Sequence, residues 1–191
     1  MNIWFSSDWH LSHTNIAGPK VSKWKSGYRD FENVYEMNKC ITQTVNKYVK
    51  HDDILYFLGD FCFGTKSKIP DLRYQFNCQN IHYIRGNHDK EIDSNKECFL
   101  SINDVLTVKH GQHKFFLSHY AHRVWLGSHR NIIHLYGHSH GSIPDYGKSM
   151  DCGIDVAYRM FGEYRPFSIE EIISIMDKRE TKIVDHHGER D

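Results

Sequence analysis

The sequence predicts an α/β sandwich. Two observations support this fold class: strand–helix–strand units fill the first half of the chain, and closely spaced strands fill the second half. The 191 residues suit a single domain, since domains usually contain roughly 100–200 residues. Hydrophobic residues make up 39% of the chain and aromatic residues 14%, which is enough for a packed core. We therefore expect one domain over residues 1–177, followed by a charged C-terminal tail over 178–191.

The first predicted strand covers residues 2–6 and leads into a long polar loop from about His10 to Asp30. Apolar residues then recur at spacings of three and four, as on one face of a helix. These residues are Val34, Met37, Ile41, Val45 and Tyr48. The pattern predicts an amphipathic helix over about 32–49.

The next elements continue the alternation of strands and helices. A second strand is predicted over 53–58, where an apolar run ends at Gly59-Asp60. A helix over about 67–77 comes next, and a third strand follows over 81–84.

The second half of the chain has strands at short intervals. They are predicted over 104–109, 113–118, 132–136 and 150–156. A last helix is expected to begin at Ser168, whose hydroxyl can cap it, with Glu171 completing a capping box.

The charge and composition argue against several classes of protein. Lys and Arg number 24 and Asp and Glu also number 24, so no net charge draws the chain toward nucleic acid or an anionic membrane. No apolar run approaches the roughly 18–20 residues of a membrane span, and the N-terminus lacks a secretory signal. We expect a cytoplasmic protein without a membrane partner. Its five cysteines form no C-x-x-C pair, which predicts reduced thiols.

Residues that commonly bind metals stand where the apolar strands stop. The candidates, in chain order, are Asp8, His10, Asp60, Asn87, His88, His119, His138 and His140. In layered α/β folds, ligands gather at the carboxyl ends of strands. Any one of these residues is explained by a turn or by a buried histidine, but the joint pattern favours a functional site. Carboxylates and imidazoles without thiolates suit Mn²⁺, Fe or Zn²⁺. The candidates are too many for one tetrahedral ion and fit two ions that share a bridging carboxylate.

The same residues resemble the motifs of a known family, the calcineurin-like metallophosphoesterases. The matching motifs, in order, are Asp8-x-His10, Gly59-Asp60, Gly86-Asn87-His88-Asp89, Ser118-His119 and Gly137-His138-Ser139-His140. The resemblance runs from about residue 2 to 175. The stretches 7–16 and 164–168 look like a small subgroup common in phages and bacteria. The resemblance implies two mixed β-sheets flanked by helices, the four-layer αββα metallophosphoesterase fold.

The resemblance also implies a role for each residue. Asp8, His10, Asp60 and His140 would hold one divalent ion. The second ion would be held by Asp60, Asn87, His119 and His138, with Asp60 as the bridge. His88 would contact the substrate and act as the general acid for the leaving oxygen.

These roles imply metal-dependent hydrolysis of phosphate esters by a metal-bound hydroxide. Metal coordination lowers the pKa of water from about 15.7 to about 7 in the best zinc cases, which makes hydroxide available at neutral pH. We expect phosphodiesters to be slightly favoured over phosphomonoesters, and the substrate to be a small phosphorylated molecule such as a nucleotide. Mn²⁺ is the metal expected to support activity in vitro, and Fe and Zn²⁺ also fit the ligands. The oligomeric state and the natural substrate stay open.

Three further residues are candidates for substrate binding. Arg85 precedes the Gly86-Asn87-His88 turn and is expected to reach a phosphate oxygen. His13 and Asn15 lie in the loop after His10 and are expected to line the substrate pocket, as the subgroup shows the same pattern.

Two other functions stay open. One is a nuclease acting on DNA or RNA ends, which is not favoured because Lys and Arg are scattered without a basic stripe. The other is a non-catalytic scaffold, which would be expected to lack metal ligands or the histidine at position 88. This chain retains all of them.

Overall fold

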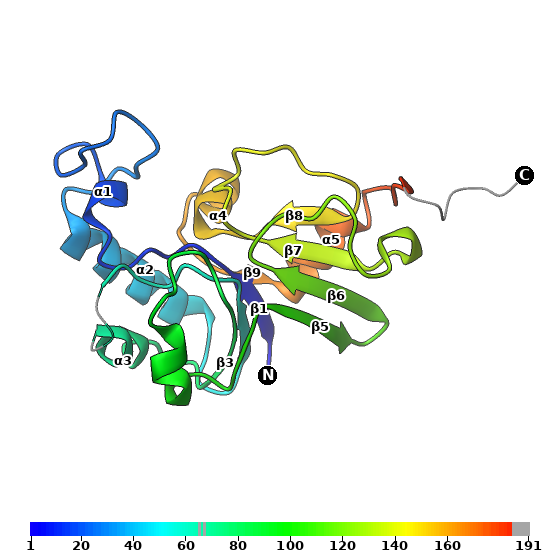
Figure 1. Ribbon diagram of the computed structural model, residues 1–191, viewed down its shortest axis with the longest axis horizontal. Coiled ribbons are helices and arrows are strands. Elements are labelled where there is room, and N and C mark those ends of the chain that lie inside the picture. Colours follow the sequence, from blue (N-terminus) through cyan, green and yellow to red (C-terminus); the bar gives the residue numbers. More distant parts are fainter. Residues whose placement is uncertain (65, 67, 185–191) are drawn as a thin grey trace, which may run out of the picture.

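Two β-sheets pack face to face in the computed structural model, which describes residues 1–64, 66 and 68–184 (Figure 1). The first sheet has the order β4-β3-β2-β1-β9, and only β9 is antiparallel to its neighbour. Its strands are β1 (Ile3–Ser6), β2 (Ile54–Phe57), β3 (Asn80–Ile84), β4 (Ser101–Asn103) and β9 (Phe167–Ser168). The second sheet has the order β5-β6-β7-β8, with β5 antiparallel to β6. Its strands are β5 (Val105–His110), β6 (His113–Ser118), β7 (Ile133–Tyr136) and β8 (Ser149–Asp151).

The helices flank the sheets, as the sequence predicts. They are α1 (Thr14–Ala17), α2 (Val34–Tyr48), α3 (Lys68–Arg73), α4 (Ile154–Phe161) and α5 (Ile169–Met176), with 3₁₀ turns η1 (Ile92–Cys98) and η2 (Ser128–Arg130). The loop around α1 projects from the body near one end of α2 (Figure 1). None of the described helices has the length and apolar character that crossing a membrane would require.

Alternating side chains of the parallel strands supply two hydrophobic cores. Trp4 of β1 and Leu55 of β2 join the core beneath α2, which presents Met37, Ile41 and Val45. Their neighbours Phe5 and Tyr56 point the other way, into the core between the two sheets. This alternation follows from the period-2 geometry of a strand, and it explains why the central strands are apolar on both faces.

Most predicted elements are confirmed, with shifts of a residue or two at their ends. The cap of the last helix is also confirmed: the Ser168 hydroxyl accepts from Glu171 N, and the Glu171 carboxylate accepts from Ser168 N at 2.9 Å. All five cysteines are free thiols.

The predicted strand over 150–156 is wrong in its second half. Strand β8 ends at Asp151, whose carboxylate accepts from Gly153 N at 2.7 Å, and α4 begins at Ile154. The prediction failed because apolar residues keep alternating with polar ones after Asp151, although the chain turns at the Asp-Cys-Gly sequence.

Smaller elements also depart from the predictions. Helix α3 ends at Arg73 rather than near 77. The Arg73 guanidinium donates to the carbonyls of Phe76 and Cys78 in the segment that follows, and to the carbonyl of Cys98 at the end of η1. The long polar loop contains α1, and the short elements η1, β4, η2 and β9 were not predicted. The predicted tail is described only to residue 184, and residues 185–191 lie outside the described part of the chain.

Candidate metal centre

The carboxyl ends of five strands bring the candidate ligands together. Asp8 and His10 follow β1, and Asp60 follows β2, whose loop runs alongside the first. Asp8 N donates to Gly59 O at 2.9 Å, and His10 N donates to Asp60 O at 3.0 Å. Asn87 follows β3, His119 follows β6, and His138 and His140 follow β7. The ligands therefore come from both sheets at the edge where their parallel strands end.

The backbone is left-handed at most of these ligands. The residues concerned are Asp8 (φ 59°), His10 (φ 49°), Asp60 (φ 61°), His138 (φ 66°) and His140 (φ 47°). Among the described non-glycine residues, Ser12 and Asn131 alone share this conformation. Such residues cost on the order of 1–3 kcal/mol each and cluster at functional sites. The fold holds strained turns at these positions, and each turn aims a ligand at the same point.

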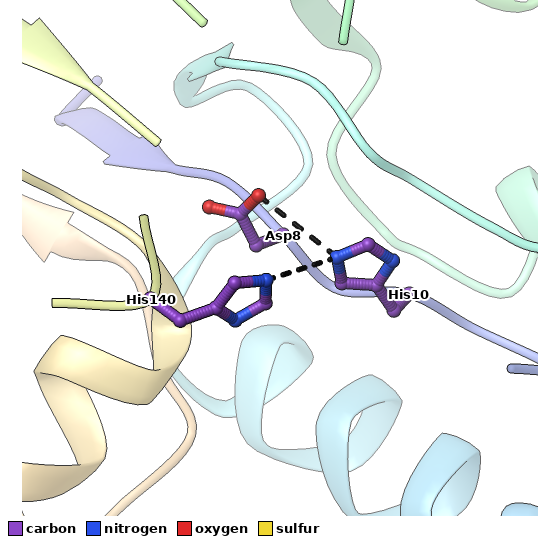
Figure 2. A group of neighbouring side chains, drawn as sticks. All are labelled: Asp8, His10 and His140. Atoms are coloured by element: carbon purple, nitrogen blue, oxygen red, sulfur yellow. Dashed lines mark hydrogen bonds and ion pairs between the residues drawn. The ribbon is translucent and has the colours of Figure 1, made fainter. Parts of the chain in front are cut away.

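Asp8, His10 and His140 form one group of potential ligands (Figure 2). His10 Nε2 lies 3.3 Å from His140 Nε2 and 4.0 Å from Asp8 Oδ1. His140 Nδ1 lies 2.6 Å from Asp155 Oδ2, which leaves its Nε2 pointing into the group. All three side chains therefore offer one atom each to a common centre.

Asp60, His119 and His138 form a second group. Asn87 belongs with it, since Asn87 Oδ1 lies 2.9 Å from both His119 Nε2 and His138 Nδ1. Asp60 stands between the groups: its Oδ2 lies 3.6 Å from His119 Nε2 and 3.6 Å from His10 Nε2.

The hydrogen bonds around His119 show that a cation suits this position. The Leu58 carbonyl lies 2.7 Å from His119 Nδ1 and accepts a hydrogen bond from it, so Nε2 is the atom whose lone pair is available to a metal. That lone pair faces Asn87 Oδ1, another acceptor. Two acceptors at this distance repel each other, whereas a metal ion would bind both. Metal-binding histidines commonly donate their other N–H to a carbonyl or carboxylate, as His119 does here.

The charges of the buried groups lead to the same conclusion. Burial raises the pKa of the Asp8 carboxyl from 3.8 to about 8, opposed by His140 and reinforced by Asp151. A buried carboxyl needs a proton or an opposite charge, and a divalent cation would supply that charge. Burial, together with His140, holds the pKa of His10 well below its usual value, so the ring is neutral and suited to bind metal.

The sequence as a whole matches one family. The model of the calcineurin-like phosphoesterase family matches residues 1–191. The chain belongs to this family. It is a metal-dependent phosphoesterase, and the two ligand groups are its candidate metal sites.

Sequence and structure comparisons also find individual proteins that resemble this chain. The phosphoesterase is 31% identical over 185 residues to an uncharacterized protein of Methanocaldococcus jannaschii, with 92% of each chain covered. The crystal structure of a protein of unknown function from Aquifex aeolicus shares the fold, with a TM-score of 0.66 and 22% identity over 91% of this chain and 98% of that one. A structure of an archaeal phosphodiesterase matches with a TM-score of 0.47 and 20% identity, over 88% of this chain and 100% of that one.

The predicted substrate-binding residues of the phosphoesterase have different surroundings. His88 is exposed, and its ring centre lies 5.5 Å from that of His10. His13 is buried with its ring centre 6.3 Å from that of His88, and burial lowers its pKa to about 4. Asn15 lines the same pocket as His13 and His88, and its Oδ1 accepts from Lys23 N.

Arg85 pairs with two acidic side chains. Its guanidinium pairs with Asp93 at 2.6 Å and with Asp104 at 2.9 Å. Two exposed carboxylates share its guanidinium, and the contact of Arg85 with a phosphate oxygen stays a prediction.

Two residues that sequence reasoning missed support His140 from behind. Asp155 accepts from His140 Nδ1, and the buried Arg29 guanidinium holds both oxygens of Asp155 at 2.7 and 2.9 Å. Arg29 also donates to the carbonyls of Asp8 and Trp9, which fixes the strained turn after β1. Burial alone would raise the pKa of Asp155, but Arg29 and His140 outweigh it and hold that pKa well below its usual range.

A third residue, Asp89, supports the turn that carries Asp60. Its carboxylate accepts from Asp60 N at 2.8 Å and from Gly86 N at 2.6 Å. Gly86 itself admits no side chain, because a Cβ there would lie 2.2 Å from Asp60 Oδ1. The Gly-Asn-His-Asp motif therefore positions Asp60 as well as supplying Asn87 and His88.

Replacing Asp155 with Asn should weaken both folding and metal binding. We expect a loss of roughly 3–5 kcal/mol in unfolding free energy, because Arg29 would stay buried without its partner charge. Metal affinity should fall about 10- to 100-fold through the loss of the orienting carboxylate. Since the folded pKa of Asp155 lies below the unfolded value of about 3.9, its contribution to stability is complete at neutral pH and declines as the pH falls below about 4.

Urea unfolding and metal titration measure these two effects. Asp93→Asn is the matched control, since it breaks an exposed pair with Arg85 that contributes at most about 1 kcal/mol. An Asp155→Asn protein that unfolds and binds metal like the control would contradict this role.

Proposed function

We propose that this phosphoesterase hydrolyses phosphodiesters with two divalent ions that share the Asp60 carboxylate. The observation that carries the proposal is the position of Asp60 Oδ2, 3.6 Å from a histidine of each ligand group. The mixed oxygen and nitrogen ligands suit Mn²⁺, Fe or Zn²⁺. When bound, a pair of such ions activates the attacking water and neutralises charge on the phosphoryl oxygens.

The chain's own residues set the orientation of the ligands and the path of the proton. Asp155 and the Leu58 carbonyl fix the rings of His140 and His119. His88 is held beside the centre by its backbone, where His88 N donates to Asp60 Oδ1 at 2.9 Å. Its exposed imidazole is free to meet substrate, and we assign it as the general acid that protonates the leaving oxygen.

Two pockets adjoining the centre support a diester substrate. One, of about 600 Å³, is lined by His88, and another, of about 410 Å³, is lined by His140. Both fall in the usual size range of ligand pockets, on the order of 300–1,000 Å³. A phosphodiester carries two organic groups where a monoester carries one. The pocket lined by His88 has room for one group, and the pocket behind His140, with Arg29 and Asp155 in its wall, is the candidate place for the other.

The preference is tested with two chromogenic substrates. Metal-stripped protein reloaded with Mn²⁺ should hydrolyse bis-p-nitrophenyl phosphate faster than p-nitrophenyl phosphate. Asp60→Asn should lower both rates by more than about 100-fold, since it removes the shared charge of the two sites, whereas Asp93→Asn should not. Faster monoester hydrolysis would indicate a phosphatase. No hydrolysis of either ester with both metals bound would contradict the proposal and favour a scaffold, unless cleavage of DNA or RNA ends revealed a nuclease.

The role of His88 predicts a dependence on the leaving group. His88→Ala should slow hydrolysis of an alkyl diester about 10²- to 10⁴-fold, because an alkoxide needs a proton to depart. Hydrolysis of bis-p-nitrophenyl phosphate should slow far less, because nitrophenolate is a stable anion. His51→Ala, which removes an exposed histidine paired with Asp52, is the control. Equal losses with both leaving groups would show that His88 acts by binding substrate and not by donating a proton.

A further inference from the structure

The pocket beside His88 has an aromatic wall. The rings of His13 and Phe63 stack with their centres 4.1 Å apart and their planes at 12°. Trp24 meets His13 edge to face at 5.2 Å, and Phe63 lies 5.3 Å from the His88 ring. These side chains come from the loop around α1 and from the segment after β2, so a continuous aromatic surface leads from the candidate acid into the pocket.

Two of these rings are exposed. Phe63 is 44% exposed although one face stacks on His13, and Trp24 is 43% exposed. Large aromatic side chains usually bury most of their surface, on the order of 150–250 Å² each. Their exposure inside a pocket that adjoins the centre indicates a surface that a ligand covers.

Among the described residues, the rest of the lining is polar apart from Val21 and carries no carboxylate. Besides the aromatic rings it includes Ser12, Thr14, Asn15 and Lys23. A purely aliphatic group would gain little from these side chains. A planar group with a polar edge and attached hydroxyls would stack on the rings and meet hydrogen-bonding partners around them. The volume of about 600 Å³ accommodates a group of the size of a nucleoside.

We propose that this pocket binds the nucleoside on the leaving-group side of a phosphodiester, with its base stacked against Trp24 and Phe63. The inference rests on the proposed function, because it takes the phosphoryl group at the metal centre and the leaving oxygen at His88. It makes Trp24 and Phe63 residues that determine specificity and leaves the chemistry to the metal ligands and His88.

The test measures binding without turnover. The ligand is the AMP analogue with a methylene group in place of the bridging 5′ oxygen, which cannot be hydrolysed, and the comparison ligand is the same ribose phosphonate without a base. Calorimetry on the Mn²⁺-loaded protein should show the base-bearing analogue bound at least about 10-fold more tightly, since stacking on aromatic side chains contributes that much or more.

Substitutions of the aromatic side chains test whether they cause the preference for the base-bearing analogue. Trp24→Ala and Phe63→Leu should each lower affinity for the base-bearing analogue about 5- to 100-fold and leave affinity for the ribose phosphonate unchanged. Trp24→Phe should keep most of the affinity, because it keeps a ring to stack on. Tyr35→Ala, which removes a 67%-exposed aromatic side chain on α2, should change neither affinity.

The outcomes separate this inference from the proposed function. Equal affinities for the two analogues, or variants that weaken both alike, would overturn the nucleoside pocket even if bis-p-nitrophenyl phosphate is hydrolysed. Base selectivity that depends on Trp24 in a protein without hydrolytic activity would uphold the pocket and contradict the proposed function.

Discussion

The position of Asp60 between two groups of histidines is the constraint on which the rest of the site depends. Its carboxylate is almost fully buried, and one oxygen lies equally far from His10 and His119, which come from different sheets. This position requires the two sheets to end at the same edge, and a carboxylate buried there needs an opposite charge nearby. The two packed sheets and their parallel strands bring the side chains to this edge, and Gly86 leaves room for the Asp60 carboxylate.

The centre is supported by charges and hydrogen bonds from outside the ligand set. Five ligands have a left-handed backbone, which is unfavourable without compensation. Arg29 bonds the carbonyls of the turn after β1, and Asp89 bonds the amides of the turns after β2 and β3. Each of these side chains is buried, so the bonds act in surroundings where they are strong. The hydrogen bonds of Arg29 and Asp89 therefore offset the backbone strain at the candidate ligands.

The sequence indicated the candidate ligands but not the residues that hold them in place. Asp8, Asp60 and His119 could be recognised because a polar residue directly after an apolar strand has a fixed place at the sheet edge. Asp155 could not, because it bonds Arg29, 126 positions away, and only the folded chain brings them together. The strand predicted over 150–156 failed for a local reason, since apolar alternation does not register the turn at Gly153. The ion pairs of Arg85 were likewise not predicted, because the path of the chain brings Asp93 and Asp104 to it.

Anomalous scattering from a crystal of the Mn²⁺-loaded protein tests the central claim most directly. We expect two peaks about 3.5–4 Å apart, one among Asp8, His10 and His140, and the other among Asn87, His119 and His138, with Asp60 touching both. A single peak at saturating Mn²⁺, or two peaks that do not share Asp60, would contradict it.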